Sequence, residues 1–146
     1  EAPVGGGTTQ TRNMTVATSV TFRPQNRTTF VLRLERFLQE SVSANNRFFI
    51  SNNAILDVTH MLPRKFSVGG NLALGIDKYP DAQAITGGGR ASRRDDIYQV
   101  GAWVAYDIQE WLSAGLSQVY RERFSTLSGQ FNYEDHQTAL NLALKF

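Results

Sequence analysis

The stretch Gln137-Thr-Ala-Leu-Asn-Leu-Ala-Leu-Lys-Phe146 alternates large apolar residues with small or polar ones. A helix would scatter the large residues around its circumference, whereas a strand sorts them onto two faces. The stretch therefore predicts a β-strand. Its apolar face is formed by Leu140, Leu142, Leu144 and Phe146.

The same period of two recurs upstream and predicts about seven strands in all. Several are longer than the ~5–6 residues usual in soluble proteins, and a tilted membrane strand needs ~9–11. The fold class predicted is all-β, an antiparallel up-and-down transmembrane β-barrel. A soluble β-sandwich or lipocalin-like barrel is the alternative. The upstream segments are residues 14–22, 29–35, 50–59, 66–77, 98–108 and 112–123.

Composition narrows the class of protein. The 146 residues are 41% apolar and 19% charged, which fits one folded domain rather than a disordered chain. A net charge of +2 is too small to indicate a nucleic-acid partner. The absence of cysteine excludes disulfides and thiolate sites. No signal peptide begins at Glu1, so we expect a processed chain or one cut from something longer.

The predicted connections alternate in length. Residues 23–27, 62–65 and 108–111 form short turns, and residues 41–47, 79–95 and 125–133 form longer polar loops. Outer-membrane barrels have short periplasmic turns and long external loops. We therefore expect one barrel domain over residues 1–146, with residues 1–10 as an external loop or linker and residues 11–146 as the strands.

Aromatic residues gather near both ends of the predicted strands. Such belts mark the two lipid–water interfaces. Phe22, Phe66, Trp111 and Phe146 lie near the short turns, and Tyr79, Tyr120, Phe124 and Tyr133 lie near the long loops.

The strand number raises a question of closure. Bacterial single-chain barrels have an even number of strands, whereas about seven are visible here. The chain is the C-terminal part of a larger barrel, or a second subunit closes the barrel, or a strand is missed. The first reading is favoured, because residues 1–10 contain Pro3 and three consecutive glycines and make a poor strand.

The C-terminal region also carries a family resemblance. The segments Glu110-Trp-Leu-Ser-Ala-Gly-Leu-Ser-Gln-Val-Tyr-Arg-Glu-Arg123 and Phe131-Asn-Tyr-Glu-Asp-His136, with the last strand, resemble the ends of Gram-negative outer-membrane porins, most closely the beta-barrel porin type 2 family. The resemblance implies a location in the bacterial outer membrane. It also implies that Leu140, Leu142, Leu144 and Phe146 form the signal that the barrel assembly machinery reads.

The candidate functional residues are the polar residues that alternate with the apolar ones along the predicted strands. Buried charges need water or partners, so this face indicates a wet lumen or a network of ion pairs. The predicted function is a channel or export conduit for polar or anionic solutes. The alternative is a non-conducting barrel that anchors or encloses a lipoprotein, a polysaccharide exporter or a surface filament. The predicted lumen residues are Arg33, Glu35, Asn53, Asp57, Asn71, Asp77, Gln99, Trp103, Asp107, Arg121, Arg123 and Asn141.

Two of these regions have specific readings. The inward Trp103 either stacks on a passing sugar ring or packs against inward glycines such as Gly101 and Gly115. The loop that contains Arg90, Arg93 and Arg94 contacts lipopolysaccharide phosphates, folds into the pore as a constriction, or is simply solvated.

Neither an enzyme nor a metal or cofactor site is expected. The histidines are His60 and His136, and both fall on the lipid-facing parity. Asp135 is adjacent to His136 on a strand and therefore points to the opposite face. Nothing in the spacing resembles a catalytic triad or a metal site. The expected partners are outer-membrane lipid and lipopolysaccharide, the barrel assembly machinery, and the strands that complete the barrel.

Overall fold

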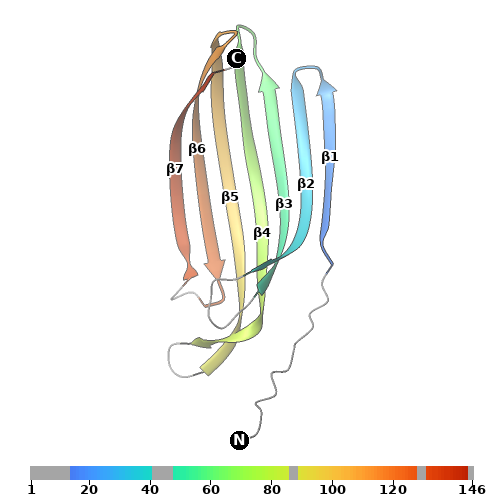
Figure 1. Ribbon diagram of the computed structural model, residues 1–146, viewed down its shortest axis with the longest axis vertical. Coiled ribbons are helices and arrows are strands. Elements are labelled where there is room, and N and C mark those ends of the chain that lie inside the picture. The colour runs from blue at the N-terminus through green and yellow to red at the C-terminus, as the bar shows by residue number, and fades with distance from the viewer. Residues whose placement is uncertain (1–13, 41–47, 86–88, 128–130, 145–146) are drawn as a thin grey trace, which may run out of the picture.

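The seven predicted strands form one antiparallel sheet. The computed structural model describes residues 14–40, 48–85, 89–127 and 131–144. Strand order follows the chain, so each strand pairs with its sequence neighbours (Figure 1). The all-β, up-and-down prediction is confirmed. The strands are β1 (Val16–Gln25), β2 (Thr28–Glu40), β3 (Phe48–Met61), β4 (Phe66–Ile85), β5 (Gly89–Gln109), β6 (Leu112–Ser125) and β7 (Tyr133–Leu144).

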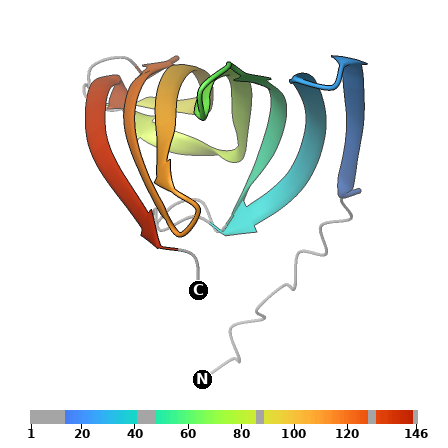
Figure 2. The same ribbon diagram turned by 90° about the horizontal axis from the view of Figure 1, so that it is seen from above.

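The sheet curves into an arc that is not closed. Seen from above, β1 and β7 lie on opposite sides of the opening (Figure 2). Within the described residues these two strands do not pair with each other. No described segment forms a helix that is long and apolar enough to cross a bilayer. The described part is thus a single curved layer, without the second sheet of a β-sandwich.

The register between strands places every second residue of each strand on the same face of the sheet. Because side chains alternate along a strand, directly paired residues point to the same side. The pairing is continuous from β1 to β7 through the middle of the sheet. One row across it consists of Ser19, Arg33, Ile55, Ala73, Gln99, Arg121 and Asp135.

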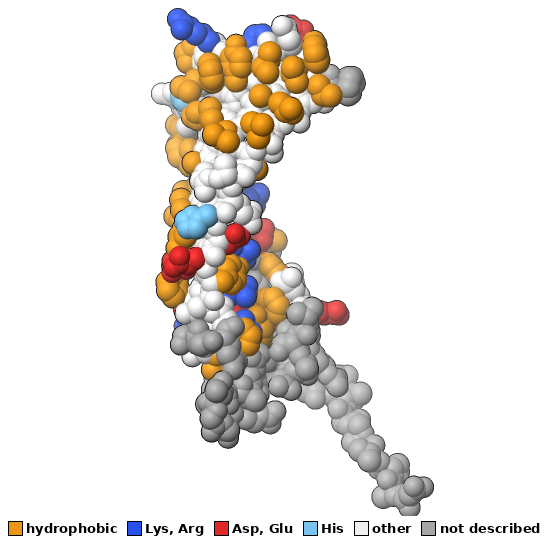
Figure 3. Space-filling model, turned by 90° about the vertical axis from the view of Figure 1, so that its left-hand side faces the viewer, with side chains coloured by type: hydrophobic (Ala, Val, Ile, Leu, Met, Phe, Trp, Pro, Cys, Tyr) orange, Lys and Arg blue, Asp and Glu red, His pale blue; other side chains and the backbone are white. Residues whose placement is uncertain are grey.

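The two faces differ in chemistry. The face that carries this row is concave, since its side chains from β2 to β6 line one shared cavity. The opposite, convex face carries the large apolar side chains, and Leu140 and Leu142 of β7 are 77% and 70% exposed. Figure 3 shows hydrophobic side chains gathered at the short-turn end of the molecule. Among the described residues the only buried hydrophobic side chain is Tyr79, so the sheet has no apolar core of the soluble type.

Two of the three short turns are tighter than predicted. Only Asn26 and Arg27 lie between β1 and β2, and only residues 110–111 lie between β5 and β6. The third turn keeps its predicted length, and Arg64 and Lys65 adopt positive φ angles of 63° and 66°. Positive φ at successive positions suits the twist of a hairpin, although it is unfavourable for residues with a Cβ.

The predicted loop over residues 79–95 is wrong. β4 continues to Ile85 and β5 begins at Gly89, so these residues form the end of a long hairpin. Tyr79 pairs with Arg93, and an irregularity between Tyr79 and Gln83 interrupts the register. Beyond this point the hairpin extends past the other strands and bends sideways (Figure 1), so that it crosses the long-loop end of the arc when seen from above (Figure 2). The glycines of residues 87–89 suggested a loop, yet β4 continues to Ile85 and β5 already begins at Gly89.

The turn geometry gives a prediction for stability. Lys65→Gly should raise the free energy of unfolding by roughly 0.5–1 kcal/mol, because glycine adopts positive φ without a steric cost. The measurement is the urea midpoint of the detergent-refolded protein. Arg27→Gly is the matched control in another turn. Arg27 has no positive φ, so glycine there should lower the midpoint, and equal shifts in both variants would contradict the explanation.

Candidate functional site

All the predicted lumen residues share the concave face of the sheet. Their register partners place Arg33, Asp57 and Asn141 on the same side as the row that contains Gln99 and Arg121. The face therefore gathers charged and amide side chains from six strands, β2 to β7. The predicted residues found there are Arg33, Glu35, Asn53, Asp57, Asn71, Asp77, Gln99, Trp103, Asp107, Arg121, Arg123 and Asn141.

Polar contacts cross the middle of this face. Arg33 of β2 donates a hydrogen bond to Asp57 of β3 at 2.7 Å, with the Arg33 side chain 44% exposed. Asn141 of β7 donates to Ser117 of β6 at 3.4 Å. These are partly solvated contacts, which typically contribute little to stability. They keep the charged side chains extended over the face.

Trp103 packs on glycine, but not on the glycines expected. Its ring covers Gly69 on the neighbouring strand β4, where an added Cβ would lie 2.4 Å from the ring. Gly101 instead faces Asn71, and Gly115 faces Ala105 and the Val104 carbonyl. Because Gly69 has no side chain, the indole ring can pack closely against β4 at this position.

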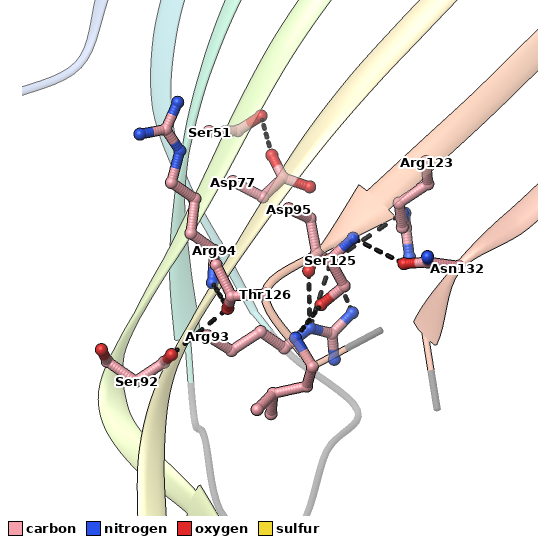
Figure 4. Close-up of polar contacts among 11 residues, drawn as sticks. Ser51, Asp77, Ser92, Arg93, Arg94, Asp95, Arg123, Ser125, Thr126 and Asn132 are labelled. Carbon is pink, nitrogen blue, oxygen red and sulfur yellow. Dashed lines mark hydrogen bonds and ion pairs between the residues drawn. The ribbon is translucent and has the colours of Figure 1, made fainter. Parts of the chain in front are cut away.

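A buried polar row lies where the hairpin begins to bend. Ser51, Asp77, Asp95 and Ser125 are register partners across β3 to β6, and each is at most 8% exposed. The Ser51 hydroxyl donates to Asp77 at 2.7 Å. The Ser125 backbone N–H donates to the Asn132 side-chain oxygen at 2.7 Å (Figure 4). Two carboxylates thus face each other within a buried row and require nearby positive charge.

Arg93 supplies most of this charge. Its Nε donates to both carboxylate oxygens of Asp95, at 2.9 and 3.1 Å, and Asp95 is fully buried. The guanidinium lies over the rings of Tyr79 at 4.3 Å and Phe131 at 3.6 Å. Phe49 stacks on the other side of Tyr79 with ring centroids 5.0 Å apart. We call Tyr79, Arg93, Asp95 and Phe131 the hairpin latch, because they join the β4–β5 hairpin to the segment after β6.

The hairpin latch was not predicted from the sequence. Tyr79 and Tyr133 were assigned to the outer aromatic belt, but Tyr79 faces inward and Tyr133 packs on Arg123 at 4.8 Å. Arg93 was assigned to an external loop that contacts lipopolysaccharide, constricts the pore or is solvated, and it is instead a buried residue of β5. Asp77 and Tyr79 are two residues apart on β4, and their register partners on β5 are Asp95 and Arg93. Extending both predicted strands past residue 79 would therefore have placed these four residues on one face. Arg94 points to the opposite side, where it pairs with Asp96 at 2.8 Å. The side chain of Arg90 lies outside the described residues.

Other aromatic residues lie on the convex face. Phe66 and Tyr106 contact each other near the short turns with ring centroids 4.5 Å apart, and Tyr98 and Phe124 do so nearer the other end at 5.9 Å.

Both histidines also lie on this face: His60 is 2.8 Å from the Thr28 hydroxyl, and the His136 ring contacts Tyr120. Arg36 lies there too and donates to Asn52 at 2.9 Å. Leu140, Leu142 and Leu144 of the predicted assembly signal are exposed on it, while Phe146 lies outside the described residues.

A comparison with protein-family models matches residues 8–146 to the family described as putative beta-barrel porin 2. The chain belongs to this family. The resemblance predicted from the C-terminal segments is confirmed, and it extends over nearly the whole chain. No curated protein and no solved structure matches the chain. Membership of a porin family favours a non-enzymatic protein.

The contact between Trp103 and Gly69 gives a second prediction. Gly69→Ala should destabilise this porin-family sheet by roughly 1–3 kcal/mol, because the new methyl group would overlap the indole ring. In a Trp103→Ala background the same change should cost much less. Urea midpoints of the four proteins form a double-mutant cycle. Additive effects would show that Trp103 does not depend on Gly69 for its position.

The hairpin latch gives a third prediction. Arg93→Met should lower the free energy of unfolding by about 3–5 kcal/mol, because it leaves the buried Asp95 carboxylate without its main partner. The matched control is Arg94→Met, which breaks an exposed pair and should cost less than about 1 kcal/mol. Hydrogen exchange should also rise at the backbone of residues 79–95 in the first variant alone. Similar losses in both variants would contradict the assigned role of burial.

Proposed function

We propose that these strands form part of a β-barrel in the bacterial outer membrane, with the convex face against lipid. The observation that carries the proposal is the separation of an exposed apolar face from a charged concave face. On β5 the convex positions from Tyr98 to Ile108 are all apolar or aromatic. At ~3.3 Å per residue they extend over about 33 Å of strand, and at a tilt of about 40° the band is ~25 Å high, as in known outer-membrane barrels.

The open edges support a larger barrel. In the part of the chain that the structure describes, β1 and β7 each pair on one side only, and an unpaired backbone group in lipid costs several kcal/mol. Additional strands, from the same chain or from a second subunit, would satisfy both edges. The exposed leucines of β7 would face outward in the assembled barrel, where the barrel assembly machinery can recognise the last strand. Lipid and lipopolysaccharide are the partners of the convex face.

The concave face would then line a water-filled channel for polar or anionic solutes. Its exposed ion pair, Arg33 with Asp57, and its amides are compatible with water, and none of them needs a dry environment. Arg121 and Arg123 lie side by side on β6 and favour anions locally. The channel function rests on this distribution of polar groups together with membership of the porin family.

One observation favours a second function. The β4–β5 hairpin bends across the long-loop end of the arc (Figure 1, Figure 2), and its Arg93 lies over the Phe131 ring of the segment after β6 at 3.6 Å. A barrel that is obstructed in this way could be a non-conducting structure that anchors or encloses a partner. A lipoprotein, a polysaccharide exporter and a surface filament are the classes of partner that fit such a barrel.

Ion conductance tests the channel function. We expect the protein purified from outer membranes to form channels in planar lipid bilayers. Substitution of both Arg121 and Arg123 with glutamate should shift the selectivity towards cations, because it reverses the charge of two concave side chains. Arg36→Glu makes the same kind of change on the convex face and should leave selectivity unaltered. A folded protein without conductance would favour the second function, and unchanged selectivity in the double variant would contradict the lining assignment.

A further inference from the structure

The concave face contains a cavity bounded by polar side chains and aromatic rings. Its volume is about 480 Å³, within the range of ~300–1,000 Å³ found for small-molecule sites. Strands β2 to β6 contribute to its wall. It lies beside the hairpin latch, with Phe49, which stacks on Tyr79, as a shared wall. The polar side chains that line it are Arg33, Gln39, Ser51, Asn53, Asn71, Asp77, Gln99, Arg121 and Arg123.

Two of its three arginines have unused donors. Arg33 is bound to Asp57 at 2.7 Å. In contrast, the Nε atoms of Arg121 and Arg123 are buried and have no hydrogen-bond partner in the part of the chain that the structure describes. A buried donor without an acceptor costs about 1–3 kcal/mol, and more where the group is charged. Because these Nε atoms have almost no accessible surface, an acceptor brought by a ligand would bind the terminal nitrogens of the two guanidinium groups instead.

The nearby carboxylates are engaged with other groups. Asp95 lies 3.8 Å from the Arg123 Nε, but Arg93 already donates to both of its oxygens. Asp77 accepts the Ser51 hydroxyl. Asp135, the register partner of Arg121 on β7, accepts a hydrogen bond from Gln137. Among the lining residues the charge is that of three arginines against one aspartate, which favours an anionic ligand over a neutral one.

The remaining wall suits a hydroxylated molecule. Gln99 is the register partner of Arg121 on β5, and Asn53 and Asn71 add further amides. Amides both donate and accept hydrogen bonds, as sugar hydroxyls do. Phe37 and Phe49 contribute apolar ring surface.

We propose that this cavity binds the oxyanion group, carboxylate or phosphate, of a hydroxylated solute about the size of a hexose. Arg121 and Arg123 hold the oxyanion, since planar guanidinium groups match carboxylate and phosphate geometry. Gln99 and the asparagines contact the hydroxyl groups. The proposal rests on the proposed function, because the solute reaches the cavity through the lumen of the barrel.

Saturation-transfer NMR on the detergent-purified native protein tests the site without requiring conductance. The probes are glucuronate for a carboxylate and glucose 6-phosphate for a phosphate, with glucose as the neutral control. At least one anionic probe should bind, and glucose should bind at least tenfold more weakly. Arg121→Gln and Arg123→Gln should each raise the Kd of that probe at least tenfold. Arg36→Gln removes a positive charge from the convex face and should leave it unchanged.

Each outcome separates this proposal from the proposed function. Binding of one anion alone identifies the oxyanion that the site selects. Equal binding of glucose, binding of neither anion, or an unchanged Kd in folded Arg121→Gln and Arg123→Gln proteins would overturn the site. Arg123→Lys retains the charge near Asp95 and tests whether a loss reflects misfolding, because a folded lysine variant should keep part of the affinity. Binding without ion conductance would leave the site intact and contradict the channel.

Discussion

Pairing in continuous register is the constraint on which the rest of this structure depends. Each strand presents alternate residues to opposite sides, so a slip of one residue would exchange the two faces of that strand. The row from Ser19 to Asp135 crosses all seven strands without such a slip. Most of the charged and amide side chains therefore gather on one face, with a few apolar ones such as Ile55 among them, while most of the large apolar side chains gather on the other.

This constraint also explains where burial occurs. In a soluble sandwich the apolar face would be covered, whereas here the buried side chains are chiefly polar: Ser51, Asp77, Arg93, Asp95 and Ser125. They lie together where the hairpin begins to bend, and there Arg93 binds Asp95 and lies over the Phe131 ring of the segment after β6. Burial is thus a local consequence of the hairpin latch rather than the driving force of the sheet. A partner for the convex face, which we propose is lipid, replaces the missing apolar core.

The period of two was sufficient to predict seven strands, their antiparallel order and the fact that the predicted lumen residues share one face of the sheet. These properties follow from the sequence because side-chain parity is a local property of an extended chain. The hairpin latch was not predicted, since it depends on Phe131, which is far from Arg93 in the sequence, and on a bend between Tyr79 and Gln83. Glycines near the hairpin tip were read as a loop for the same reason: composition reports flexibility, but not the backbone pairing that overrides it. Trp103 is a second example. The alternation along β5 was enough to predict that the indole faces inward, but its contact with Gly69 depends on the register between β4 and β5.

The hairpin latch and the oxyanion cavity share the charge of Asp95. Its carboxylate binds Arg93 closely and lies 3.8 Å from Arg123, so neither arginine is independent of the other. Because Arg93 donates to both oxygens of Asp95, the Arg123 Nε has only a longer ion-pair contact with this carboxylate and makes no hydrogen bond within the described residues. Were the hairpin to move and Arg93 to leave, Asp95 would be available to Arg123 and would compete with a bound anion. If the proposed cavity binds an anion, the position of the hairpin and the affinity for that anion would therefore be coupled through one buried carboxylate.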